Sequence, residues 1–271
     1  MEEAALAEVI ADHMHERMVD HQETEWQFEA RDLERVEGWL ERRPSISGLS
    51  PIFGATRELN DTYYDTGDWR LYRAGYVLRV RRDGGSLEAT MKSLSAAEGA
   101  LRRRREISEP LDGRTTTPKC ARGPVGERLR MLVGARDLRP LFEVRTRRRT
   151  FALSPQSPSA GAVVEDASGN VRPREPERGA VGEVALDEAE IAGDGEEPTR
   201  LSRVEVEAAS STALHEAIEG FVDELREALN LRPTEKSKFE TGLSAAGLTP
   251  PRASNLLPKE WGGRSGEKEE R

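Results

Sequence analysis

The chain contains a single cysteine, Cys120, and only four histidines among its 271 residues. One cysteine cannot form an intramolecular disulfide, and the histidines do not occur in HExxH or a comparable metal-binding spacing. No apolar run approaches the roughly 20 residues of a membrane-spanning helix, and no N-terminal run resembles a signal peptide. These absences predict a cytoplasmic protein without a membrane partner.

Positive charge is in the minority, with 41 Lys and Arg against 50 Asp and Glu and a net charge of -9. Such a balance disfavours diffuse attraction to nucleic acid. The basic runs 102–105 and 145–149 also have no aromatic residues between them on which bases could stack. A Walker A sequence and a glycine-rich dinucleotide turn are both missing. An anionic ligand would therefore have to be held by local clusters of Lys and Arg.

Helical spacing of apolar residues occurs in four segments. It predicts an N-terminal helical extension over 1–20, a helix that begins after the N-cap Asp32, a helix over about 125–133, and a helix over 214–229. Residues 246–271 are rich in Pro, Gly, Lys and Glu and lack periodicity, which predicts a disordered tail. One folded domain is expected over residues 21–245.

Seven further segments alternate charged and apolar residues with the period of a β-strand. They cover residues 23–29, 76–82, 87–92, 101–108, 142–149, 183–187 and 204–207. Taken singly, each is the ordinary pattern of a half-exposed antiparallel strand with its charges in water. As a set, they concentrate carboxylates on some strands and Lys and Arg on others. If the sheet closes with its apolar faces outward beneath helices, these charges line a lumen.

A charged lumen has to contain water or a ligand, because unpaired charges in a dry interior are costly. Guanidinium groups match phosphate oxygens, and clustered carboxylates are the hard ligands that Mg²⁺ or Mn²⁺ prefers. A phosphate chain bridged by a metal ion would satisfy both sets of charges. The sequence alone leaves this interpretation beside that of an ordinary surface sheet.

Eight motifs resemble those of the CYTH (triphosphate tunnel metalloenzyme) family, in the order in which the family has them. They are Glu23-Thr24-Glu25-Trp26-Gln27, Tyr63-Tyr64-Asp65-Thr66 with the following 71–82 stretch, Thr90-Met91-Lys92, Arg104-Arg105-Glu106, Arg145-Thr146-Arg147-Arg148, Glu183-Val184-Ala185-Leu186-Asp187-Glu188, Val204-Glu205-Val206-Glu207 and Lys236-Ser237-Lys238. The resemblance extends over residues 21–245. It implies an α+β fold: a closed eight-stranded antiparallel β-barrel with packing helices outside.

The resemblance also implies a metal-dependent hydrolase of triphosphate-containing substrates that uses Mg²⁺ or Mn²⁺. Inorganic triphosphate is the favoured substrate and thiamine triphosphate the next. A class IV-type adenylate cyclase and a low-activity module that binds polyphosphate or nucleotides are the alternatives. By the same resemblance, the metal ligands are Glu23, Glu25, Glu183, Asp187, Glu205 and Glu207. The substrate-binding residues are Arg79, Arg81, Lys92, Arg104, Arg145, Arg147, Lys236 and Lys238, and the catalytic residues are Glu106, Lys92 and Lys238.

Position 27 departs from the family signature, which has Lys where this chain has Gln27. Glutamine keeps much of the length of lysine but loses the positive charge that would meet a phosphate. Arg102, Arg145 and Arg149 are the candidates to replace that charge. A separate group of aromatic residues could stack on a base or a thiazolium ring or could simply pack: Trp69, Tyr72 and Tyr76.

Overall fold

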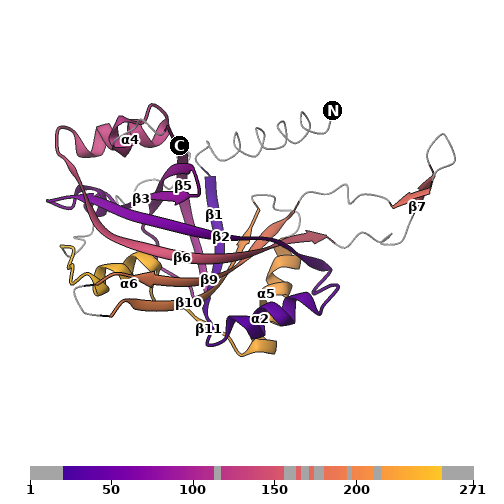
Figure 1. The fold of residues 1–271 in the computed structure, drawn as a ribbon. Helices are drawn as coiled ribbons and strands as arrows, with labels where there is room; N and C mark the ends of the chain where they lie inside the picture. Colours follow the sequence, from indigo (N-terminus) through magenta and orange to yellow (C-terminus); the bar gives the residue numbers. More distant parts are fainter. Residues whose placement is uncertain are drawn as a thin grey trace, which may run out of the picture.

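Eight antiparallel strands form a closed barrel in the computed structural model (Figure 1), which describes residues 21–112, 117–155, 163–165, 171–173, 180–193, 197–209 and 215–251. The strand order is β10-β9-β6-β2-β3-β4-β5-β1, and pairing of β1 with β10 closes the ring. The bounds are β1 His21–Glu29, β2 Leu49–Thr66, β3 Tyr76–Asp83, β4 Ser86–Ser93, β5 Leu101–Leu111, β6 Leu138–Pro155, β9 Gly182–Ile191 and β10 Thr199–Ala208. The predicted eight-stranded barrel is confirmed.

Three short strands lie outside this ring. β11 (Arg232–Pro233) pairs with β1, and β7 (Val163–Glu165) pairs with β8 (Val171–Pro173) in a separate two-stranded sheet. A hairpin at residues 84 and 85 joins β3 to β4, where Gly84 takes a positive φ of 54° that favours glycine. The predicted helix over 1–20 lies outside the described residues, as does the part of the predicted tail beyond residue 251.

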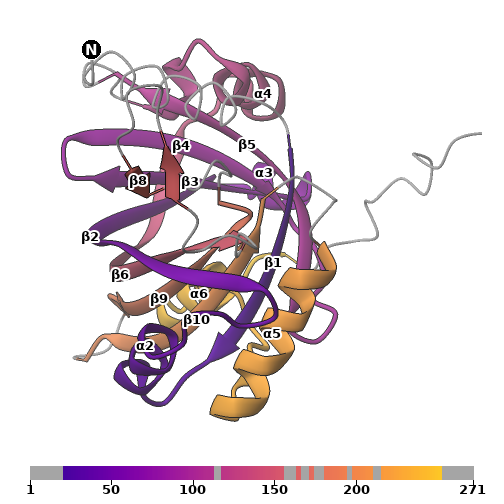
Figure 2. The same cartoon turned by 90° about the vertical axis from the view of Figure 1, so that its right-hand side faces the viewer.

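Helices cover the outside of the barrel on two sides (Figure 2), and these are α2 (Leu33–Glu41), α3 (Arg70–Arg73), α4 (Pro124–Val133) and α5 (His215–Leu229), with the 3-10 turn Pro118–Cys120 before α4. The N-cap Asp32 accepts a hydrogen bond of 2.9 Å from the Arg35 amide, as its position before the apolar stripe predicts. None of the helices in the described part of the chain is long and apolar enough to cross a membrane.

Two hydrophobic clusters bury the outer face of the barrel. One joins β1, β6, β9 and β10 to α2 and α5, and the fully buried Phe28, Phe151 and Phe221 are among its members. The other joins β3, β4 and β5 to α4 through Leu78, Met91 and Leu129, which are also fully buried. Because the side chains in these two clusters face outward, the opposite face of the same strands points into the barrel, and this face carries most of the charged residues.

A third cluster fills one end of the barrel from inside. Helix α6 (Lys238–Ala245) packs there, with Phe239 and Leu243 against Tyr63, Phe142 and neighbouring apolar residues. Ser237 begins α6 in a capping box with Glu240. The chain continues past Ala245, and Leu248 packs against the same cluster. The barrel is therefore apolar at the α6 end, and its charged section lies beyond.

Candidate functional site

The charged section of the barrel encloses a cavity of about 790 Å³ whose wall divides into two arcs of neighbouring strands. Strands β9, β10 and β1 contribute carboxylates, namely Glu183, Glu205, Glu207, Glu23 and Glu25. Strands β3, β4 and β5 contribute most of the cations, namely Arg79, Arg81, Lys92, Arg102 and Arg104, together with Glu88 and Glu106. Lys238 from α6 and Arg148 from β6 complete the lining. An acidic arc and a basic arc thus line the same cavity.

The acidic arc is built by the seam that closes the barrel. In the register of β1 with β10, Glu25 lies opposite Glu207, and Gln27 lies opposite Glu205. Since alternate residues share a face, Glu23 also points inward, and both Glu23 and Glu25 are only 4% exposed. The sequence motifs on β1 and β10 therefore converge although they are separated by most of the chain.

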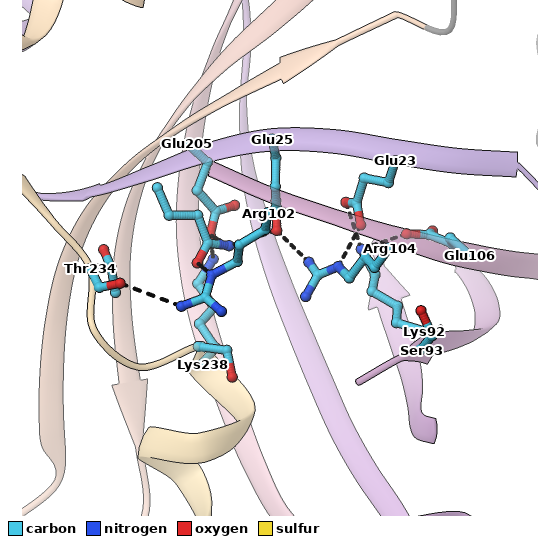
Figure 3. A network of polar contacts seen from close by, with 12 residues as sticks. Glu23, Glu25, Lys92, Ser93, Arg102, Arg104, Glu106, Glu205, Thr234 and Lys238 are labelled. Carbon is cyan, nitrogen blue, oxygen red and sulfur yellow. Dashed lines mark hydrogen bonds and ion pairs between the residues drawn. The ribbon is translucent and has the colours of Figure 1, made fainter. Parts of the chain in front are cut away.

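Lys92 and Arg104 connect the basic arc to the carboxylates of β1 (Figure 3). Lys92 Nζ lies 2.8 Å from Glu23 Oε1 and 2.5 Å from Glu106 Oε2. Arg104 donates through Nε to Glu23 Oε2 at 2.6 Å and through Nη2 to Glu25 Oε1 at 2.5 Å. The predicted binding and metal-ligating residues on β1, β4 and β5 are thus brought together as one ion-pair network.

A second network lies nearer α6. Arg148 binds Asp187 with both Nε and Nη2, at 2.8 and 2.6 Å, and its Nη2 also reaches Glu205 Oε2 at 2.7 Å. Lys238 Nζ donates to Glu205 Oε1 at 2.8 Å and to Asp187 Oδ2. Because Lys238 is the first residue of α6, the helix that fills the end of the barrel also places an ammonium group in the cavity.

Asp61 on β2 holds the two arginines of β3 and was not among the predicted site residues. Arg81 donates to both carboxylate oxygens of Asp61, at 2.7 and 2.8 Å, and Arg79 Nη1 lies 3.8 Å from Oδ2. Asp61 is 1% exposed. It follows that Asp61 orients the guanidinium groups from the inner face of β2, which it shares with Tyr63. Its position two residues before Tyr63, on the same face of a strand, is the sequence signal that could have identified it.

Burial and neighbouring charges shift the pKa values of these carboxyl groups in opposite directions. Burial opposes the ionisation of Glu23 and Asp187, but the adjacent Lys and Arg side chains outweigh it and hold both pKa values below their usual range. Burial raises the pKa of Glu25. Burial, followed by the charge of Glu23, raises the pKa of Glu207 to about 7. Glu207 has no ion pair or hydrogen bond with another described residue, and the charge of Lys92 offsets only part of this effect.

Three predicted substrate-binding residues do not line the cavity. Arg145 and Arg147 are exposed on the outer face of β6, and Arg147 lies 3.9 Å from the exposed Glu58. Phe142 and Val144 share the inner face with Arg148 and fill the barrel beside α6, so the predicted orientation of this strand is wrong. The packing of Phe142 and Val144 against α6 decides which face of β6 points inward. The alternation of residues within one strand does not contain that information.

Lys236 is likewise exposed, and only its backbone oxygen has a role in the interior, where it accepts a hydrogen bond from Arg203 at 2.7 Å. The predicted aromatic residues pack: Trp69 and Tyr72 lie against the inner cluster with Phe239, and Tyr76 lies against the outer cluster beneath α4. Glu183 is exposed to the cavity, and its carboxylate has no partner among the described residues.

A divalent metal ion fits the chemistry of the acidic arc. All the donors there are carboxylate oxygens, which suit Mg²⁺ or Mn²⁺, and Glu207 is a carboxylate whose raised pKa a nearby cation would lower. Within the described ranges, however, no three Asp, Glu, His or Cys side chains are grouped so as to hold a metal ion. Glu23, Glu25 and Glu205 instead contact Lys and Arg side chains. The donors are therefore present, but cations of the protein occupy most of them.

Comparison with solved structures and with family models identifies this architecture. A candidate adenylyl cyclase from Hippeastrum, described as having a dominant triphosphatase activity, aligns with a TM-score of 0.52 and 17% identity, and covers 84% of this chain and 98% of its own. A candidate adenylate cyclase from Bacillus halodurans aligns with a TM-score of 0.50 and 15% identity, over 80% of this chain and 95% of its own. No curated protein matches the sequence significantly. The CYTH domain model matches residues 21–243, and the chain therefore belongs to the CYTH family.

Proposed function

We propose that the protein hydrolyses a short triphosphate, with inorganic triphosphate as its substrate, and that it uses Mg²⁺ or Mn²⁺. The observation that carries this proposal is the cavity in which an acidic arc on β9, β10 and β1 faces a basic arc on β3, β4 and β5. A phosphate chain is the ligand that can contact cations along one side while a metal ion links its other side to carboxylates. The family and its triphosphatase-like structural neighbour support the same activity.

In this proposal the basic arc binds the phosphate oxygens. Arg79, Lys92 and Arg104 would exchange their carboxylate partners for phosphate, and Lys238 would approach from the end of the cavity. Phosphoryl transfer is catalysed largely by positioning and by stabilisation of charge, so no nucleophilic side chain is required. Burial opposes the ionisation of Glu106, but Lys92 and Arg79 together outweigh it and lower the pKa of this carboxyl group, which favours the ionised form. It can therefore accept a hydrogen bond from the attacking water and orient it.

The acidic arc would hold the metal ion through Glu23, Glu25, Glu205 and Glu207. When bound, a divalent ion polarises phosphoryl oxygens and neutralises charge on the leaving phosphate. Glu183 lies farther along the same arc, and Asp187 is fully buried behind Arg148 and Lys238. Asp187 is therefore better suited to orient these cations of the protein than to contact the ion directly.

The lining favours an inorganic substrate over thiamine triphosphate or ATP. A thiazolium ring or a base would need an accessible aromatic face. Apart from the half-buried His21 at the start of β1, the aromatic residues in the described cavity wall are Tyr63 and Phe239, which are 6% exposed each and are packed against one another. An inorganic chain requires only charge and hydrogen bonds, and the described lining supplies these.

Orthophosphate release tests the proposal. Inorganic triphosphate, thiamine triphosphate, ATP and pyrophosphate should be compared with Mg²⁺, with Mn²⁺ and with EDTA. We expect turnover of inorganic triphosphate in the presence of metal and loss of turnover in EDTA. Lys92→Met should lower turnover by about 100-fold or more, because it removes a preorganised charge. The exposed Lys236→Met is the matched control and should leave turnover unchanged. Binding of triphosphate without turnover would instead favour a polyphosphate-binding module.

A further inference from the structure

Arg102 is a cavity cation that lacks a carboxylate partner. It lines the cavity from β5 and is 4% exposed. The cavity residues Arg79, Arg81, Lys92, Arg104, Arg148 and Lys238 each have a carboxylate oxygen within 4.0 Å. Arg102 has none among the described residues. Because a buried charge without a counter-charge is costly, this guanidinium group indicates an anionic ligand.

Neutral groups hold Arg102 in place. Its Nε donates to Gln27 Oε1 at 3.0 Å, and its Nη2 lies 3.4 Å from the backbone oxygen of Thr234 (Figure 3). Its Nη1 makes no hydrogen bond with a described residue and is not completely buried. The guanidinium group is thus fixed along one edge, while one nitrogen is left for a ligand in the cavity.

Gln27 carries no charge and orients Arg102, which does. Its Nε2 donates to Glu25 Oε1 at 2.9 Å and lies 3.4 Å from Glu205 Oε1, so the amide bridges carboxylates of two neighbouring strands. An amide carries no net charge, and it cannot attract a phosphate through a charge of its own. The same amide uses its oxygen to orient Arg102, which does carry the charge. The positive charge that position 27 lacks is therefore found one strand away.

The other two arginines that could replace this charge lie elsewhere. Arg145 is exposed on the outer face of β6. Arg149 pairs with Glu37 and, at 2.9 Å, with Glu188 outside the cavity. We propose that Arg102, oriented by Gln27, is a phosphate-binding residue that supplies to the substrate the positive charge missing from β1. This inference rests on the proposed function, because it takes a triphosphate as the ligand.

Binding of inorganic triphosphate with Mg²⁺, measured by calorimetry, tests the assignment. Arg102→Gln should weaken binding by about 10- to 100-fold, the usual effect of a charge-assisted hydrogen bond. Arg102→Lys should retain most of the affinity because it retains the charge. Arg103→Gln is the matched control, since it removes the same charge from the exposed face of the same strand. It should leave the affinity within about twofold of the parent.

Moving the charge separates binding from a structural role. The double variant Gln27→Lys with Arg102→Gln places the cation on β1, and we expect its affinity to return to within about fivefold of the parent. Gln27→Lys alone should change affinity little, because Arg102 already supplies the charge and repels a second cation. Melting temperatures without added ligand are measured for every variant. Arg102→Met replaces Arg102→Gln if the latter does not fold.

The outcomes are distinguishable. If the parent binds no triphosphate, the proposed function fails and this inference fails with it. If the parent binds and Arg102→Gln binds equally well, only the assignment of Arg102 is overturned. It is also overturned if Arg102→Gln lowers the melting temperature and the affinity together and the double variant restores neither, since Arg102 would then be a structural residue.

Discussion

Glu207 is a cavity carboxylate without an ion-pair partner among the described residues. Burial and the neighbouring Glu23 raise its pKa from 4.5 to about 7, and no described residue donates a hydrogen bond to it. Because the pKa is raised in the folded protein, ionisation of Glu207 lowers the free energy of unfolding as the pH rises from about 4.5 to about 7. Below this window the carboxyl is protonated in both states and the cost is absent.

We therefore expect Glu207→Gln to raise the melting temperature by a few degrees at pH 8 and to leave it nearly unchanged at pH 4, below the window, with EDTA present. The amide mimics the protonated acid, so the two proteins differ only where the parent is ionised. Thermal unfolding followed by circular dichroism over this pH range is the measurement. Glu143→Gln removes an exposed carboxylate from the outer face of β6 and is the control. An equal effect of Glu207→Gln at both pH values would contradict the assignment.

Among the elements, α6 joins the apolar end of the barrel to the charged cavity. Its Gly242 packs so closely that an added Cβ would lie 2.0 Å from the ring of Phe142. In an open helix, Gly→Ala would stabilise by about 1 kcal/mol through helix propensity. Here the ring is buried and cannot move aside freely. Overpacking, which costs about 1–3 kcal/mol, should therefore outweigh the gain in helix propensity and make the substitution destabilising.

Gly242→Ala is thus expected to lower the melting temperature by several degrees. Because Lys238 begins the same helix, the shift of α6 should also weaken triphosphate binding. Ser244→Ala on the exposed face of α6 is the control for helix propensity. Melting curves and calorimetry of both variants check the expectation. A more stable Gly242→Ala protein would show that α6 can move away from Phe142 at little cost.

The sequence predicted the strands better than it predicted α6. Alternation in 76–82 and 101–108 predicted strands with Arg79 and Arg104 on the charged face, and the structure confirms both segments as β3 and β5. On β6 both faces contain arginine, so the choice of inner face depended on the contacts of Phe142 with α6. Helix α6 has only 8 residues and a short apolar stripe, which makes it hard to recognise from sequence. The predicted roles of the site residues stay predictions.

At the scale of the whole molecule, the cavity is a set of ion pairs that two ligands together could replace. Phosphate alone would take Lys92 and Arg104 from Glu23 and Glu25 and leave these carboxylates facing a polyanion. A metal ion alone would have to displace the same cations from the carboxylates. When both ligands bind, the cations turn to phosphate and the carboxylates to metal. Each ligand thus removes the electrostatic cost of the other, and we expect their binding to be positively coupled.

Melting temperatures measure this coupling, because a ligand that binds the folded state stabilises it. The rise in melting temperature with Mg²⁺ and inorganic triphosphate together should exceed the sum of the rises with each ligand alone. Orthophosphate with Mg²⁺ is the control pair of ligands. In Lys92→Met, Glu23 and Glu106 lose a cation they share, so Mg²⁺ alone should now raise the melting temperature more than in the parent. The exposed Lys236→Met should behave like the parent. Additive shifts in the parent, with no added response to Mg²⁺ in Lys92→Met, would mean that metal and phosphate occupy independent sites.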